Sequence, residues 1–264
     1  RAGTAQKRML LQSLTDARVS VFVEYVPALQ VGGDYTCIRA VGEDKLYVIV
    51  SDVSGHGISS SLVMARVGPE IERLVQAGEN VAAIAQALNI VMTAPQAEDE
   101  MYLTLFGSEI DFALETISYV NCGHPAQFLW SDKLSSYARL ESENLPVGLF
   151  GPDKFGTPRT ITLDIHPGDK LILFTDGMLE LKLEDGSELG ERGLISMFRE
   201  LVEKPSEATK QEIFDRIKAA QTDHLNDDLL FIFIDIKGGS RLRQKEENSL
   251  SEPSKATDPN LSRT

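Results

Sequence analysis

The chain has 264 residues, of which 42% are hydrophobic and 25% charged, so it can bury one large core as an ordinary globular protein does. Its formal net charge of −14 argues against nucleic acid or an anionic membrane surface as a partner. Two cysteines, Cys37 and Cys122, are too few for a disulfide framework and indicate a reducing, cytoplasmic compartment.

The N-terminal residues lack the charged-then-apolar pattern of a signal peptide, and no apolar run approaches the roughly 18 residues that cross a bilayer. The chain begins with Arg1 rather than Met. We therefore expect a piece of a longer protein, whose missing N-terminal part could still anchor it to a membrane.

Period-two alternation and β-branched residues predict a series of short strands. They cover residues 19–26, 32–41, 45–53, 101–111, 115–122, 126–130, 134–140, 160–165, 170–175 and 229–236. The second and third strands are expected to form a hairpin around the turn at 42–44. A loop rich in Gly and Pro is expected at 145–158.

Helical spacing of apolar residues predicts the remaining regular elements. These helices cover residues 4–14, 58–77, 81–92, 190–202 and 206–220. Asn80 is expected to cap the third helix and Ser206 the last one. The helix at 58–77 is expected to bury one broad face, formed by Ile58, Leu62, Val67, Ile71, Leu74 and Val75.

Residues 237–264 contain no aromatic residue and many Ser, Lys and Glu, which is typical of a disordered tail. The expected organisation is therefore a linker helix at 1–14, one domain at 15–236 and a tail at 237–264. Strands, a helical pair, more strands, helices and a last strand that returns to the sheet favour an α+β fold. Two sheets flanked by helices suit this order better than alternating βαβ units.

Aspartates stand at the ends of several predicted strands. Asp52 and Asp176 each follow a buried apolar strand and precede a glycine turn. Asp34 follows two glycines, and Asp227 with Asp228 comes directly before the last strand. Any one of these acids alone is at least as often a turn residue facing solvent. Four such placements together favour a shared site.

Carboxylates are hard oxygen ligands that suit Mg²⁺ or Mn²⁺ better than Zn²⁺. Three or more of them in one place would repel each other unless cations neutralised their charge. Two such ions roughly 4 Å apart can clamp a phosphoryl group and activate a water molecule. A cysteine-phosphatase loop is excluded, because neither cysteine is followed six positions later by Arg.

As an ordered set, the motifs resemble the bacterial PPM-type (PP2C-like) serine phosphatases of the stage II sporulation E and sigma-B regulator class. The resemblance covers roughly residues 10–236. It rests on GGD at 32–34, SDVSGHG at 51–57, MYLTLF at 101–106, NCGHP at 121–125, FTDG at 174–177 with Glu180, GSELG at 186–190 and NDD at 226–228.

The resemblance implies a four-layer α-β-β-α sandwich that binds two Mn²⁺ or Mg²⁺ ions. It also implies hydrolysis of phosphoserine or phosphothreonine by activated water, without a covalent phosphoenzyme. Catalysis would rest on Asp52 and Asp176. The implied metal ligands are Asp34, Asp52, the carbonyl of Val53, Asp176 and Asp227, with Asp228 as the neighbour of the last one.

Two histidines stand in these motifs. His56 could act as a general acid or hold the phosphate, although between two glycines a turn role is about as common. His124, in the NCGHP motif, is expected to be structural.

The resemblance also implies partners. The substrate would be a phosphorylated anti-sigma-factor antagonist, a small STAS-domain protein, and a sensor domain would lie upstream in the full-length chain. A homodimer is left open, and no nucleic-acid partner is expected.

The chain departs from the family pattern at two positions, where Cys37 replaces an acid and Leu230 replaces Thr or Ser. The first departure could weaken one metal, and the second removes a supporting hydrogen bond. These departures keep open a catalytically weak regulatory scaffold as an alternative to the phosphatase. A two-metal phosphohydrolase of small phosphate esters is a further alternative.

Overall fold

The computed structural model describes residues 14–28, 31–55, 57–94, 101–183, 186–203, 211–213, 215 and 227–238. The predicted linker helix, apart from Leu14, lies outside these residues, as do Ser206, most of the helix at 206–220 and nearly all of the tail. Leu14 itself belongs to a short strand rather than to a helix.

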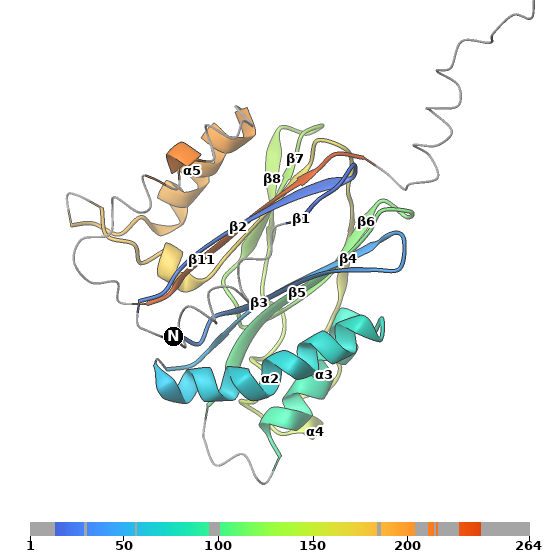
Figure 1. Cartoon of the computed structure of the whole chain (residues 1–264), viewed down its shortest axis with the longest axis vertical. Coiled ribbons are helices and arrows are strands. Elements are labelled where there is room, and N and C mark those ends of the chain that lie inside the picture. Colours follow the sequence, from blue (N-terminus) through green and yellow to red (C-terminus); the bar gives the residue numbers. More distant parts are fainter. Residues whose placement is uncertain are drawn as a thin grey trace, which may run out of the picture.

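The described chain forms two antiparallel sheets that face each other (Figure 1). The six-stranded sheet has the order β1 (Leu14–Thr15), β2 (Val19–Val26), β11 (Leu229–Ile236), β10 (Lys170–Phe174), β7 (Gln127–Ser131) and β8 (Ser136–Leu140). The five-stranded sheet has the order β3 (Tyr35–Val41), β4 (Lys45–Val53), β5 (Leu103–Asp111), β6 (Thr116–Cys122) and β9 (Ile161–Asp164).

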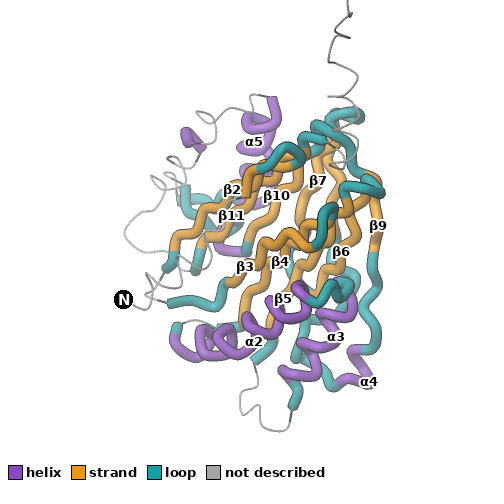
Figure 2. The backbone as a smooth tube through the Cα atoms, turned by 45° about the vertical axis from the view of Figure 1, so that its right-hand side comes forward, coloured by secondary structure: helices purple, strands orange, loops and turns teal. Residues whose placement is uncertain are grey.

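Helices cover the outer faces of both sheets, which gives the expected α-β-β-α order of layers (Figure 2). The five-stranded sheet is covered by α2 (Ile58–Gln76), α3 (Val81–Met92) and the short α4 (Pro152–Phe155). The six-stranded sheet is covered by α5 (Gly190–Glu203). No helix within the described ranges is long and apolar enough to span a membrane.

The predicted strand positions are largely confirmed, and those of β2, β4 and β11 agree at both ends. The hairpin of β3 and β4 is confirmed by their antiparallel pairing. The Asn80 cap is also confirmed, because its Oδ1 accepts a hydrogen bond from the amide of Ala83 at 2.9 Å. The last strand returns to the sheet between β2 and β10, as expected. The short helix α4 was missed inside the loop predicted at 145–158.

The prediction for the buried face of α2 is confirmed for Val67, Ile71, Leu74 and Val75. It was wrong for Ile58 and Leu62, which are 72% and 66% exposed. Small residues take part in the buried face, and a hydrophobic pattern does not register them. At Gly68 an added Cβ would stand 3.0 Å from the ring of Tyr35, so the helix approaches β3 closely there. The buried residues of α2 are Ser60, Val63, Met64, Val67, Gly68, Ile71, Leu74 and Val75.

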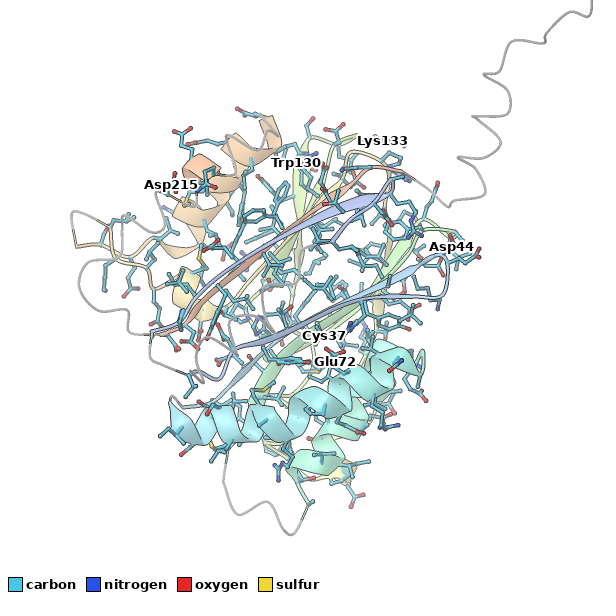
Figure 3. The ribbon with its side chains drawn as sticks, viewed as in Figure 1. Cys37, Asp44, Glu72, Trp130, Lys133 and Asp215 are labelled. Atoms are coloured by element: carbon cyan, nitrogen blue, oxygen red, sulfur yellow. The ribbon has the colours of Figure 1, made fainter. Side chains whose placement is uncertain are left out.

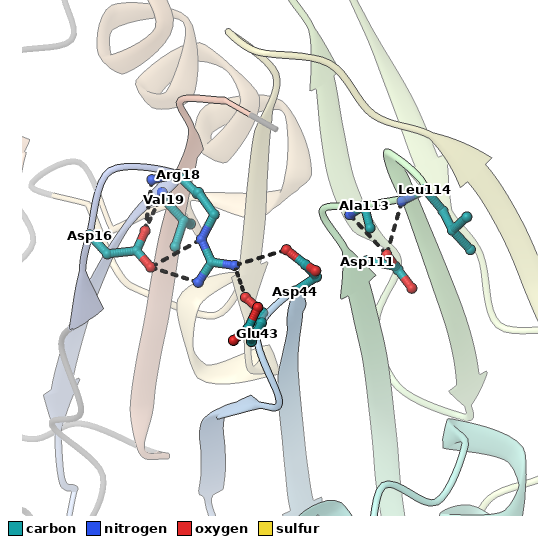
Figure 4. A network of polar contacts seen from close by, with 8 residues as sticks. All are labelled: Asp16, Arg18, Val19, Glu43, Asp44, Asp111, Ala113 and Leu114. Carbon is teal, nitrogen blue, oxygen red and sulfur yellow. Dashed lines mark hydrogen bonds and ion pairs between the residues drawn. The ribbon is translucent and has the colours of Figure 1, made fainter. Parts of the chain in front are cut away.

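A polar network joins the two sheets near the beginnings of β2 and β4 (Figure 4). The buried guanidinium of Arg18 forms an ion pair with Asp16 at 2.8 Å and donates a hydrogen bond to the carbonyl of Glu43 in the β3–β4 turn. It also lies 3.8 Å from the carboxylate of Asp44. This network fixes one end of the sandwich, and the acidic motifs lie at the other end of the same strands.

Candidate metal centre

The two sheets bring acidic residues together from segments that are far apart in the sequence. Asp34 precedes β3, and Asp52 lies at the end of β4 in the same sheet. Asp176 follows β10, and Asp227 precedes β11 in the opposite sheet. The hydroxyl of Thr175 donates a 2.8 Å hydrogen bond to Asp34 Oδ2, which places the two groups side by side across the sandwich.

Glycines allow these segments to approach each other. At Gly33 an added Cβ would stand 3.0 Å from the carbonyl oxygen of Val53 and 3.1 Å from Asp52 Oδ1. At Gly32 an added Cβ would overlap the carboxylate of Asp228, only 1.4 Å from Oδ2. The GGD motif therefore has a steric role, because any side chain at these positions would displace an acid of the site.

Burial and mutual repulsion raise the pKa values of the clustered acids. The pKa of Asp52 rises to about 8, first through burial and then through the charges of Asp176 and Asp227. Burial is also the largest cause that raises the pKa of Asp34, followed by the charges of Asp52 and Asp228. The pKa of Asp176 is raised by burial and then by Asp227. Such a cluster favours added positive charge.

The chemistry of the donor set fits divalent cations. No ion pair between described residues engages Asp34, Asp52, Asp176 or Asp227, so a bound cation would not have to displace Lys or Arg. Across the described ranges, however, no three acidic, histidine or cysteine side chains already surround one metal position. The acids share one end of the sandwich.

Asp228 differs from the other acids because its two oxygens already have partners. Its Oδ2 accepts a 3.0 Å hydrogen bond from the hydroxyl of Tyr25, and its Oδ1 accepts one of 2.8 Å from the amide of Ala28. Burial raises the pKa of Asp228 above its usual value, and these two hydrogen bonds oppose part of that rise. The geometry therefore favours Asp227 as the ligand of the last motif. Asp228 holds the end of β2.

The two departures from the family pattern lie outside the cluster of acids. Cys37 is buried beside Glu72 of α2 (Figure 3), and burial followed by the charge of Glu72 raises the pKa of its thiol to about 12. It therefore faces the helical layer, whereas Asp34 contacts the opposite sheet. Leu230 lacks the hydroxyl of the family's Thr or Ser. Its backbone amide nevertheless donates a 3.2 Å hydrogen bond to Thr175 Oγ1.

His56 lies outside the described residues, so its predicted role stays a prediction. His124 is buried at the connection between β6 and β7 and bonds to both sheets, in agreement with the expected structural role. Burial lowers the pKa of His124 to about 4, which keeps the ring neutral at pH 7.

Two further residues that contact the acids, Thr175 and Tyr25, were not among the predicted ones. Thr175 precedes Asp176 within the FTDG motif, so a hydroxyl next to a ligand acid was a visible signal. Tyr25 lies on an alternating strand, and nothing local indicates that its hydroxyl meets Asp228, which is 203 positions away.

The fold and the sequence are similar to those of known phosphatases. The chain is 26% identical over 236 residues to the phosphoserine phosphatase RsbP of Bacillus subtilis, covering 88% of this chain and 56% of RsbP. It superposes on the SiaA-PP2C domain of Pseudomonas aeruginosa with a TM-score of 0.74 and 21% identity, covering 89% of this chain and 94% of that domain. The chain also superposes on RsbX in complex with magnesium, with a TM-score of 0.65 and 20% identity, covering 86% of this chain and 100% of RsbX. These two structural likenesses show the fold.

The sequence model of the stage II sporulation protein E (SpoIIE) family matches residues 42–237, which is more than half of the chain. The chain therefore belongs to the SpoIIE family, and its domain has the PP2C-like sandwich. The boundaries at 1–14, 15–236 and 237–264 stay a prediction.

Proposed function

We propose that this domain is a metal-dependent protein serine/threonine phosphatase. The observation that carries the proposal is the buried cluster of acids from both sheets, in which burial and then the charges of Asp176 and Asp227 raise the pKa of Asp52 to about 8. Two Mn²⁺ or Mg²⁺ ions would be held by Asp34, Asp52, Asp176, Asp227 and the carbonyl of Val53. Bound there, the ions would activate a water molecule and neutralise the phosphoryl oxygens.

The residues of the chain would orient and support this centre. Thr175 holds the carboxylate of Asp34 in place while its own backbone pairs with Leu230. Gly33 leaves room for the Val53 carbonyl and the Asp52 carboxylate at the same point. His56, which follows Gly55 in the sequence, is proposed to hold the phosphate or donate a proton to the leaving serine oxygen.

The comparisons support phosphoserine as the substrate group, because RsbP is named a phosphoserine phosphatase. The magnesium in the RsbX structure supports a divalent cofactor. The chain spans about half of the length of RsbP, so the activity and partners of the whole protein are part of the proposal. We propose a phosphorylated STAS-type anti-sigma-factor antagonist as the substrate, an upstream sensor domain as the regulator and the cytoplasm as the location.

The test compares hydrolysis of p-nitrophenyl phosphate with that of a phosphorylated STAS-domain protein, each with Mn²⁺ and with EDTA. We expect Mn²⁺-dependent release of phosphate from the protein substrate. Turnover of the small ester alone would favour the small-molecule phosphohydrolase. Mn²⁺ binding without any turnover would favour the regulatory scaffold. Neither Cys37 nor Leu230 removes a group from the cluster of acids, so the structure gives the scaffold no specific support.

A further inference from the structure

The interior beneath the acids contains a polar bridge between the two sheets. Thr104 of β5 is the cross-strand partner of Asp52 on β4, so the two side chains project from the same face of the five-stranded sheet. Thr104 Oγ1 lies 2.8 Å from His124 Nδ1. On the other side of the ring, His124 Nε2 lies 3.0 Å from the carbonyl oxygen of Phe174 in the six-stranded sheet. Phe174 stands two positions before Asp176.

The partners of the ring determine its tautomer. A carbonyl oxygen can only accept, so Nε2 must carry the proton that bonds to Phe174. In a neutral ring Nδ1 then accepts the hydroxyl proton of Thr104, and burial keeps the ring neutral. Every donor and acceptor of the ring is therefore used, and the ring has one defined orientation between the sheets.

The end of β10 is held from a second direction by Gln127. The side-chain oxygen of Gln127 accepts from the Phe174 amide at 2.7 Å, and its Nε2 donates to the Phe174 carbonyl at 3.2 Å. Gln127 belongs to β7, in the same sheet as β10, so it fixes the strand within that sheet. Of Gln127 and His124, only His124 links Phe174 to the five-stranded sheet, which carries Asp52.

From this geometry we propose that His124 is a positioning residue that, through Thr104 and the Phe174 carbonyl, sets the spacing between the acids of the two sheets. The inference rests on the proposed function, because spacing matters if Asp52 and Asp176 share a metal centre. Groups that hydrogen-bond around metal ligands typically contribute 10- to 100-fold in metal affinity. His124 acts one bond further from the ligands, so we expect an effect of about tenfold.

The first test removes the hydroxyl of Thr104 while keeping its shape. In the full 264-residue chain, Thr104→Val is expected to weaken Mn²⁺ binding about tenfold in isothermal titration. Thr104→Ser keeps the hydroxyl and is expected to restore the affinity. Ser108→Ala is the matched control, because Ser108 lies on the same face of β5 and its hydroxyl donates to the Val48 carbonyl at 3.0 Å. It should lower the melting temperature and leave the Mn²⁺ affinity unchanged.

A second test removes the two hydrogen bonds of the His124 ring one at a time. The amide of Asn reaches the position of Nδ1, and the amide of Gln reaches the position of Nε2. His124→Asn should therefore keep the bond to Thr104, and His124→Gln should keep the bond to Phe174. Each is expected to bind Mn²⁺ with an affinity between those of the wild type and His124→Ala. Nitrogen-15 NMR of the wild type should show the Nε2-protonated tautomer.

The outcomes separate this inference from the proposed function. Mn²⁺ affinities of Thr104→Val and His124→Gln within twofold of the wild type would overturn the inference, as would an equal loss in Ser108→Ala. If the wild type binds Mn²⁺ but releases no phosphate from proteins, the proposed function fails and the dissociation constants still decide the inference. A wild type that binds no Mn²⁺ overturns both.

Discussion

Replacing Asp52 with Asn is expected to stabilise the metal-free protein and to abolish its binding of divalent ions. Burial, followed by the charges of Asp176 and Asp227, raises the pKa of Asp52 from 3.8 to about 8. The folded state therefore holds this proton more tightly than the unfolded state does. The resulting stabilisation is fully present below about pH 4 and is lost as the pH rises toward 8.

The size of this destabilisation at pH 7 follows from the gap between pH 7 and the unfolded pKa of 3.8, because the folded pKa lies above pH 7. At pH 7 the unfolded carboxyl is ionised, whereas the folded one is still largely protonated. The roughly three pH units above 3.8 correspond to about 4 kcal/mol at about 1.4 kcal/mol per unit. The uncharged amide of Asn avoids this cost of about 4 kcal/mol, but the substitution loses about 1 kcal/mol of hydrogen bonding. The net gain of about 3 kcal/mol should raise the Tm by roughly 6–12 °C.

The assay is thermal and urea unfolding in EDTA between about pH 5 and 8, followed by the same measurement with Mn²⁺. The wild type should lose stability as the pH rises and regain it with Mn²⁺, while Asp52→Asn should show a flatter profile and no response to the ion. Asp164→Asn removes an exposed charge of β9 and serves as the control. An Asn variant that is less stable than the wild type in EDTA at pH 7 would refute the electrostatic account.

Three further substitutions test other parts of the structure. Asp176→Ala should abolish phosphatase activity and Mn²⁺ binding while the circular dichroism spectrum stays unchanged, and retained turnover would remove the metal assignment. Gly33→Ala places a Cβ 3.0 Å from the Val53 carbonyl and should cost about 1–3 kcal/mol of stability together with metal affinity, and titration with Mn²⁺ at wild-type affinity would contradict this. Asn80→Ala removes the cap of α3 and should lower the free energy of unfolding by about 1 kcal/mol. A changed Mn²⁺ affinity in that variant would show that α3 is coupled to the centre.

The elements that sequence analysis placed well are those whose signal is local. The strand β4 is a continuous apolar run rich in β-branched residues that ends near Asp52, and the Asn80 cap bonds within its own first turn. Only the beginning of α2 was placed wrongly, because Ile58 and Leu62 satisfy a helical pattern but are exposed, while the small residues Ser60 and Gly68 are buried. Small residues let a helix pack closely against a sheet, but a hydrophobic pattern does not identify them.

For the candidate site, the sequence by itself determined which acids are proposed as ligands, because each stands at the end of a buried strand beside glycines or a tight turn. Tertiary structure alone decided how they are used. It engages the two oxygens of Asp228 with Tyr25 of β2 and with the Ala28 amide beyond that strand. It also joins Thr175 to Asp34 across 141 positions and places His124 between the sheets. The physical reason is that hydrogen bonding and charge repulsion depend on distances and burial, which strands remote in sequence acquire only when the two sheets pack together.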